Sequence, residues 1–92
     1  MSDFFFVEDS SRYIHVLFSD ILYFEANVRH SLLITTKREH IISHPLDTIE
    51  RLVPSNGFCR IHRSFIISLR HMTWFDHSRA CVGRRRLPIG KQ

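Results

Sequence analysis

The sequence has 92 residues, of which 43% are hydrophobic, and a formal net charge of +4. This length supports a single domain over residues 1–92 and excludes two. No apolar run approaches the roughly 20 residues of a membrane span and no signal peptide opens the chain, so the sequence predicts a cytoplasmic location without membrane contact.

The charge is distributed unevenly along the chain. Residues 1–56 have a balance of −3, whereas residues 57–92 have a balance of +7 with Asp76 as their single acid. This asymmetry predicts a polyanionic partner at the C-terminal part, because counterion release from phosphates supplies much of the affinity for nucleic acids. Membrane phosphates suit the chain less well, since it has no amphipathic basic helix.

The first half of the chain is predicted to form short strands. Apolar or alternating runs place them at residues 4–7, 12–18, 21–26, 32–36 and 39–43. The strand at 12–18 is expected to be partly covered on both faces, and the strand at 21–26 to be central because it is apolar on both faces. Its one acid, Glu25, is interpreted as a structural partner for an arginine or a backbone donor. Residues 27–31 are interpreted as a polar connection, and Lys37 and Arg38 as a hairpin tip.

One helix is predicted between residues 43 and 54. Ser43 or His44 is expected to cap it, with Pro45 in the first turn and Pro54 as the stop. An apolar stripe at helical spacing would cover the sheet: Leu46, Ile49, Leu52 and Val53. The outer face would carry Asp47 and Glu50, which disfavours a recognition helix because DNA phosphates repel acids.

The segment 58–67 concentrates hydrogen-bond donors at the end of a strand. Arg60, His62, Arg63 and Ser64 fall within five residues and are followed by an apolar run. A guanidinium fork suits a phosphate or a guanine edge, and the hydroxyl and imidazole add single donors. These side chains could equally form a solvated strand face.

Two further strands are predicted at 71–75 and 80–82, followed by the triplet Arg84, Arg85 and Arg86. Such a triplet has two interpretations that remain open here. It can protect a sheet edge from aggregation, or it can bind phosphates.

The residues do not predict catalysis, a metal or a cofactor. Cys59 and Cys81 lack a metal-ligand spacing and are interpreted as reduced thiols. His40 and His44 have an i,i+4 spacing but fall on a strand and at a helix start. Ser64 has His62 nearby without an acid or a glycine elbow to complete a triad.

Taken together, these motifs resemble a LytTR domain, the DNA-binding module of the LytR/AlgR class of bacterial response regulators. The strongest match is the Phe58–Phe65 segment, F-x-R-x-H-R-S-F, and the next is D-I-L-Y-F-E at residues 20–25. The resemblance covers residues 4–91. Two departures are Ser68, where the family commonly has Asn, and an end at Gln92, before the basic tail of many members.

The resemblance implies a mostly β fold: an elongated arrangement of small antiparallel sheets with one short α-helix, which binds double-stranded DNA through loops in successive major grooves. Base contacts would come from Arg29, His30 and Ser31, from Arg63 with His62 beside it, and from Lys91. On the chemistry of the side chains, phosphate contacts are expected from Arg60, Ser64 and some of the triplet Arg84, Arg85 and Arg86. The implied role is transcription regulation in a two-component system.

The resemblance also concerns the rest of the protein. It implies a receiver or sensor domain in the full-length protein, so that these residues would be one excised domain, although stand-alone members exist. Whether the domain forms a homodimer on DNA stays open. The alternative function is a small β module that binds RNA or a protein partner. Tyr13, Tyr23, Trp74 and the phenylalanines are expected to be mostly interior by alternation, which disfavours an RNA-stacking surface.

Overall fold

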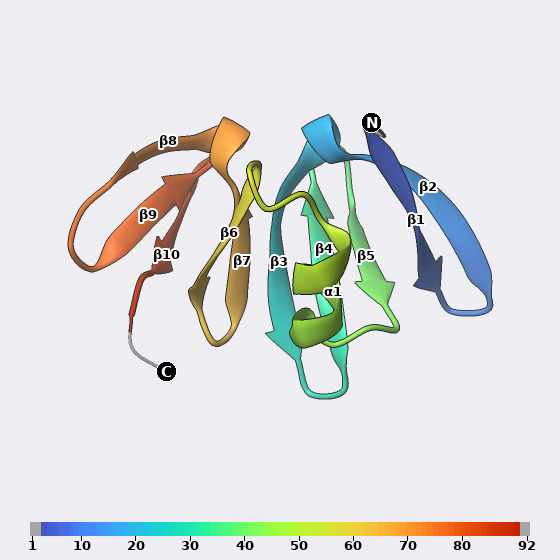
Figure 1. Ribbon diagram of the computed structural model, residues 1–92. Helices are drawn as coiled ribbons and strands as arrows, with labels where there is room; N and C mark the ends of the chain where they lie inside the picture. The colour runs from blue at the N-terminus through green and yellow to red at the C-terminus, as the bar shows by residue number, and fades with distance from the viewer. Residues whose placement is uncertain (1–2, 91–92) are drawn as a thin grey trace.

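The computed structural model describes residues 3–90 (Figure 1). The strands are β1 (Phe4–Asp9), β2 (Arg12–Leu17), β3 (Ile21–Asn27), β4 (His30–Thr35), β5 (Glu39–Ile42), β6 (Phe58–His62), β7 (Phe65–Ser68), β8 (Met72–Phe75), β9 (Arg79–Val82) and β10 (Arg85–Pro88). The α-helix α1 covers Leu46–Leu52, and two short 3₁₀ helices, η1 and η2, cover Phe18–Asp20 and Leu69–His71.

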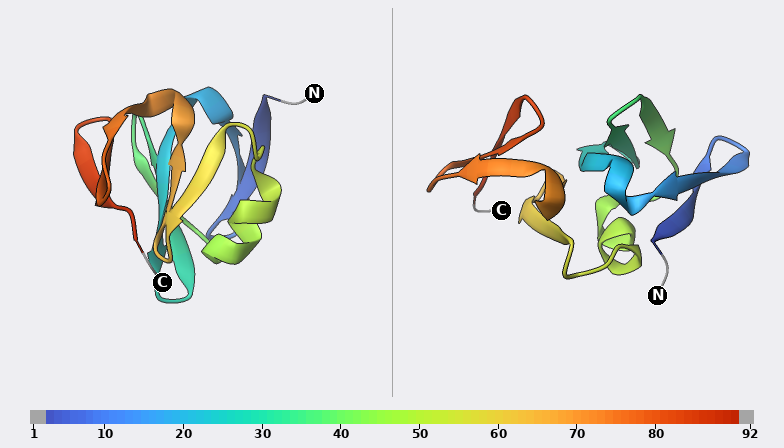
Figure 2. Two further views of the ribbon diagram at one scale, coloured as in Figure 1. Left: turned by 60° about the vertical axis from the view of Figure 1, so that its left-hand side comes forward. Right: turned by 90° about the horizontal axis from the view of Figure 1, so that it is seen from above.

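Three antiparallel sheets lie side by side along the molecule. A five-stranded sheet of order β5-β4-β3-β7-β6 occupies the middle, the β1–β2 hairpin lies at one end, and the sheet β10-β9-β8 lies at the other (Figures 1 and 2). The principal extents are 38 × 28 × 23 Å. The predicted fold, an elongated set of small antiparallel sheets with one short helix, is therefore confirmed.

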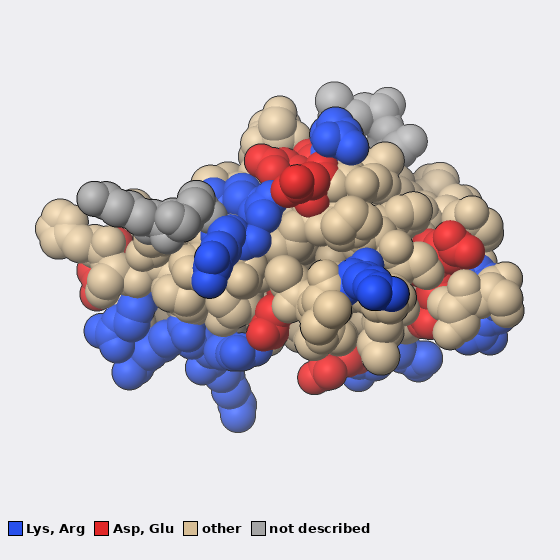
Figure 3. All heavy atoms as spheres, turned by 90° about the horizontal axis from the view of Figure 1, so that it is seen from below, with Lys and Arg blue, Asp and Glu red and all other residues tan. Residues whose placement is uncertain are grey.

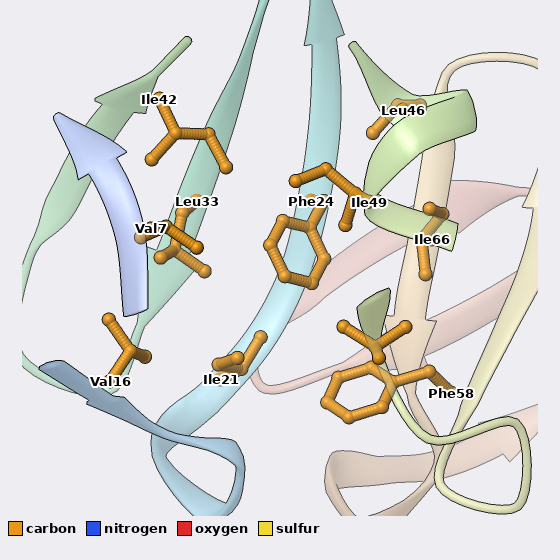
Figure 4. Close-up of a cluster of buried hydrophobic side chains, with 11 residues drawn as sticks. Val7, Val16, Ile21, Phe24, Leu33, Ile42, Leu46, Ile49, Phe58 and Ile66 are labelled. Carbon is orange, nitrogen blue, oxygen red and sulfur yellow. The ribbon is translucent and has the colours of Figure 1, made fainter. Parts of the chain in front are cut away.

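The first hydrophobic core fills the space between the central sheet, α1 and the β1–β2 hairpin (Figure 4). Phe24 on β3 is fully buried there, and its ring contacts those of Phe5 on β1 and Phe58 on β6. Ile49 of α1 and Ile66 of β7 lie in the same cluster. This core holds the helix and the N-terminal hairpin against one face of the central sheet.

A second core joins the other face of the central sheet to the sheet β8–β10. Its buried members are Tyr23, Phe65, Ile67, Ala80, Val82 and Leu87. Because successive residues of a strand point to opposite faces, β3 contributes Tyr23 to this core and Phe24 to the first. The prediction that residues 21–26 form a central strand, apolar on both faces, is confirmed.

The helix α1 is shorter than predicted and begins differently. Pro45 is the residue before its first turn, in an extended conformation, and no side chain caps the helix, so the prediction of a Ser43 or His44 cap was wrong. Leu52 is 47% exposed, so it lies outside the buried stripe. The helix ends before Pro54, as predicted. No helix within residues 3–90 is long and apolar enough to cross a membrane.

Several aromatic side chains predicted to be interior are exposed instead. Tyr13 on β2 is 67% exposed and Trp74 on β8 is 39% exposed. Among the phenylalanines, Phe6 and Phe75 are also exposed. The β1–β2 hairpin forms a separate two-stranded sheet, so its outer face, which carries Tyr13 and His15, has no cover from the described part of the chain. Alternation predicts which residues share a face, but it does not say whether a second layer covers that face.

Candidate nucleic-acid interface

Two hairpin turns lie next to each other at one edge of the central sheet. Glu25 of β3 pairs with Phe65 of β7, so the turn that follows β3 and the turn that precedes β7 share this edge (Figure 1). The Ala26 amide donates a hydrogen bond of 2.9 Å to the Ser64 carbonyl and ties the turns together. With two strand spacings between the hairpin axes, the turns are about 10 Å apart.

Each turn presents an arginine to solvent. Arg29 lies in the β3–β4 turn and Arg63 in the β6–β7 turn, and both are exposed. Neither guanidinium has a hydrogen bond or an ion pair within residues 3–90. His30, at the start of β4, is exposed beside Arg29. The edge therefore offers two unpaired guanidinium groups from segments 34 positions apart in the chain.

The β3–β4 turn is tighter than predicted. Asn27 pairs with His30, so Val28 and Arg29 alone form a two-residue hairpin turn in place of the expected five-residue connection. Val28 has a φ of 50°, in the left-handed region that such turns require at this position.

Arg60 on β6 stabilises the β6–β7 turn through hydrogen bonds to its carbonyl groups. Its Nε donates a hydrogen bond of 3.0 Å to the His62 carbonyl, and its Nη2 donates to the Arg63 carbonyl. Its Nη1 reaches Asp47 at 2.9 Å and Glu50 at 3.1 Å on α1. The guanidinium lowers the pKa of the Asp47 carboxyl, first through this hydrogen bond and then through its charge. Arg60 thus fastens the turn to the helix.

His62 and Ser64 also stabilise this turn. The His62 Nδ1 accepts a hydrogen bond of 3.0 Å from the Ser64 amide. The Gly90 amide donates to the Ile61 carbonyl at 3.0 Å, so the chain after β10 passes beside β6. The C-terminal segment therefore approaches the same turn as Arg63.

Arg84 lies in the two-residue β9–β10 turn, and Arg85 and Arg86 begin β10. This turn lies beside Leu22 at the start of β3, at the opposite end of that strand from the turn that carries Arg29 (Figure 1). The three arginines differ in their contacts. Arg84 is exposed, with no hydrogen bond or ion pair within residues 3–90. Arg85 donates to the Tyr23 hydroxyl at 2.6 Å and to Glu25 Oε1 at 3.1 Å. Hydrogen bonding to Tyr23 raises the pKa of Arg85. Arg86 lies over the Trp74 ring, 5.8 Å from its centroid. The predicted structural partner of Glu25 is therefore Arg85.

Two predicted contact residues, Ser31 and Lys91, are not among the exposed side chains described above. Ser31 is fully buried, and its hydroxyl donates a hydrogen bond of 2.7 Å to the His44 carbonyl. The prediction that Ser31 contacts DNA is therefore corrected: its side chain joins β4 to the segment before α1. Lys91 lies outside the described residues.

Lys and Arg side chains gather on the edge that carries the two turns. Figure 3 looks onto this edge from below and shows blue groups along it, the largest on the side of the β8–β10 sheet. Acidic side chains are fewer on that side and more frequent from the middle of the molecule to the side of the β1–β2 hairpin. The edge is thus a basic surface with exposed donors, as duplex DNA requires.

A comparison with protein-family models matches the chain to the LytTr DNA-binding domain over residues 11–87. The chain belongs to this family. The LytTr domain is 32% identical, over 65 residues, to the sensory transduction protein LytR of Staphylococcus epidermidis. The aligned residues make up 70% of this chain and 26% of that protein. The chain therefore spans about a quarter of the length of this relative.

The fold of the LytTr domain has a solved counterpart. A LytTr DNA-binding domain of a putative methyl-accepting/DNA response regulator from Bacillus cereus matches with a TM-score of 0.79 at 24% identity, over 97% of this chain and 87% of that one. The match supports the arrangement of sheets described above. The match to the family model confirms the sequence-based resemblance to this family.

Sequence reasoning missed the residues that support the interface of the LytTr domain. Tyr23 was treated as a core residue only, yet its hydroxyl accepts a hydrogen bond from Arg85. Arg79 was not selected, although it lies 5.8 Å from the centroid of the Trp74 ring. The sequence predicts that the returning strand begins at residue 80, whereas β9 begins at Arg79. Hairpin spacing on both sides of residues 76–78 is the one signal that could have placed Arg79 and Trp74 on paired strands.

Proposed function

We propose that this LytTr domain binds double-stranded DNA in a sequence-specific manner and thereby controls transcription. The supporting observation is the pair of unpaired arginines on neighbouring turns, Arg29 and Arg63, at one basic edge. Arginine can bind a guanine edge with two hydrogen bonds, and it gives the commonest specific contact in a major groove. The family assignment supports DNA as the partner.

The spacing of the turns refines how they would meet DNA. The turns of Arg29 and Arg63 are about 10 Å apart, whereas successive major grooves are about 34 Å apart. We therefore assign these two turns to adjacent parts of one site. Binding in successive grooves would need contacts from a further part of the domain, whose longest extent is 38 Å over the described residues.

Selection of bound duplexes from random sequences, followed by footprinting, tests this function. We expect a defined site with protection over about one helical turn. Recovery of duplexes without a shared sequence would contradict sequence-specific binding. Equal affinity for a selected duplex and a scrambled duplex of the same length would contradict it as well.

Arg60 is expected to act as a positioning residue. Arg60→Ala should weaken specific binding about tenfold, because roughly 1.5 kcal/mol of charge-assisted hydrogen bonding to the turn carbonyls is lost. The slope of log K against log salt should stay unchanged, because the Arg60 guanidinium is bound to carbonyls and carboxylates of the protein and not to a phosphate. Fluorescence anisotropy at several salt concentrations measures both quantities.

Asp47→Ala provides the control for Arg60. This variant removes an exposed helix carboxylate but leaves both carbonyl hydrogen bonds of Arg60 in place, so binding should change little. If Arg60→Ala instead reduces the salt slope by about one counterion, Arg60 contacts a phosphate, as the sequence alone predicted.

Arg84 and Arg85 are expected to differ in their phosphate contacts. Arg84→Ala should reduce the salt slope by about 0.9, the value for one phosphate contact. Arg85→Ala should reduce it less, because Glu25 lies 3.1 Å from Arg85 and offsets its charge. The salt dependence of binding to a random duplex measures both variants. Equal reductions would contradict the difference.

A second candidate function is binding of single-stranded nucleic acid. The observation that favours it is Trp74, which is 39% exposed and has the guanidinium groups of Arg79 and Arg86 each 5.8 Å from its ring centroid. Aromatic rings beside cations are stacking platforms for unpaired bases. Competition of a selected duplex with single-stranded RNA of equal length decides between the two. Displacement of the duplex by RNA would favour this second function.

The context of the domain in the whole protein is also a proposal. The matched relative is a sensory transduction protein and is longer than this chain. We propose that a receiver or sensor domain accompanies the LytTr domain in the full-length protein, that it works on DNA in the cytoplasm, and that DNA binding brings two copies together. Sedimentation of the domain with its selected duplex would measure the number of copies bound.

A further inference from the structure

Val28 combines a strained backbone with a fully exposed apolar side chain. Its φ is 50° and its side chain is 98% exposed, the highest value among the large hydrophobic residues of the described chain. A β-branched residue with a positive φ is a clear outlier, because its side chain crowds the backbone in that region. Nothing within residues 3–90 compensates for this strain through burial of the side chain.

Two other hairpins of the same molecule show what this backbone position normally accepts. The β1–β2 turn has Ser10 at a φ of 60°, and the β9–β10 turn has Gly83 at a φ of 61°. Both residues open a two-residue turn, as Val28 does. A small or polar residue meets the needs of the turn in those cases, so nothing in the turn itself calls for a valine at position 28.

We propose that Val28 contacts the 5-methyl group of a thymine in the major groove. The inference rests on the proposed function, because it needs the β3–β4 turn to meet DNA. Val28 lies at the tip of this turn, next to Arg29, which is assigned to base reading. On a duplex, the thymine methyl is the apolar group among the base edges, and it is displayed in the major groove alone. Val28 would therefore add recognition of A·T pairs beside the guanine read by Arg29.

Single replacement of thymine by deoxyuridine tests this contact, since it removes the methyl and keeps every hydrogen-bonding group. In the selected duplex, one replacement should weaken binding of the unmodified protein roughly three- to fivefold, the effect of losing one buried methyl. The same replacement should have no effect on Val28→Ala. Fluorescence anisotropy with each singly replaced duplex measures these affinities.

Ile41→Ala is the matched control, because Ile41 is another β-branched residue, 57% exposed, on β5. This variant should keep the full sensitivity to deoxyuridine. Val28→Gly should be at least as stable to heat as the unmodified protein, because glycine accepts a positive φ without strain. A folded Val28→Gly protein without deoxyuridine sensitivity would support the contact independently of Val28→Ala.

The outcomes separate this inference from the proposed function. If the unmodified protein prefers its selected duplex but shows the same deoxyuridine sensitivities as Val28→Ala, the thymine contact is refuted and sequence-specific binding stands. If the unmodified protein prefers no duplex, the proposed function fails and the contact fails with it. If one thymine is coupled to Val28 and not to Ile41, the contact is established.

Discussion

Arg63→Ala is expected to lower the affinity for the selected DNA site by roughly 1–3 kcal/mol, about 5- to 150-fold, the range for loss of a bidentate guanine contact. Binding to random duplexes should fall far less, because the contact that is lost is to a base edge and not to a phosphate. The side chain is exposed and without partners in the described structure, so the variant should fold normally. Titration of both duplexes by fluorescence anisotropy measures the ratio.

Arg63→Lys and Arg12→Ala are the controls for this expectation. Lysine keeps the positive charge but lacks the planar fork, so Arg63→Lys should lose specificity and keep the salt slope. Arg12 is an exposed arginine on the β1–β2 hairpin, away from the β6–β7 turn, and Arg12→Ala should change neither affinity. Equal losses of Arg63→Ala on the selected and random duplexes would refute base reading.

Much of the fold follows from local sequence patterns. Residues 21–26 are apolar on both faces, and only a central strand buries both. The end of α1 before Pro54 follows from the missing amide and fixed backbone of proline. The Glu25 partnership with an arginine follows from the cost of leaving a partly buried acid unpaired. These features depend on a few neighbouring residues.

The features that local patterns did not predict depend on tertiary structure. Ser31 looked like a polar loop residue, but it is buried because β4 passes under the segment before α1. Tyr13 looked interior, but the β1–β2 hairpin has no second layer over its outer face. The internal contacts of Arg60 depend on α1 lying beside β6, and no spacing along the chain indicates that proximity.

The candidate site shows the same division. The donors of segment 58–67 were identified by chemistry, and the structure places Arg63 at the turn, while Arg60 and His62 support it. Arg29 was selected through the family resemblance rather than its own pattern. Its case now rests on the pairing of β3 with β7, which brings its turn beside that of Arg63. Long-range strand pairing therefore creates the site from residues that look ordinary in the sequence.

Phe24→Ala is expected to be the most destabilising single change, lowering the free energy of unfolding by about 3–5 kcal/mol. Phe24 is fully buried where the central sheet, the β1–β2 hairpin and β6 meet, with ring centroids 6.5 Å from Phe5 and 6.2 Å from Phe58. Domains of this size have a total stability of about 5–15 kcal/mol. Urea denaturation followed by circular dichroism measures the change.

Phe75→Ala is the matched control for this core substitution. It makes the same chemical change at a side chain that is 65% exposed, so stability should stay within about 0.5 kcal/mol. Because β3 ends in the turn that carries Arg29, the loss of Phe24 should also reduce DNA binding, in proportion to the unfolded fraction. A loss of less than about 1 kcal/mol for Phe24→Ala would contradict this packing. In that case, the rigid support inferred for the two turns would have to come from the second core, around Tyr23 and Phe65.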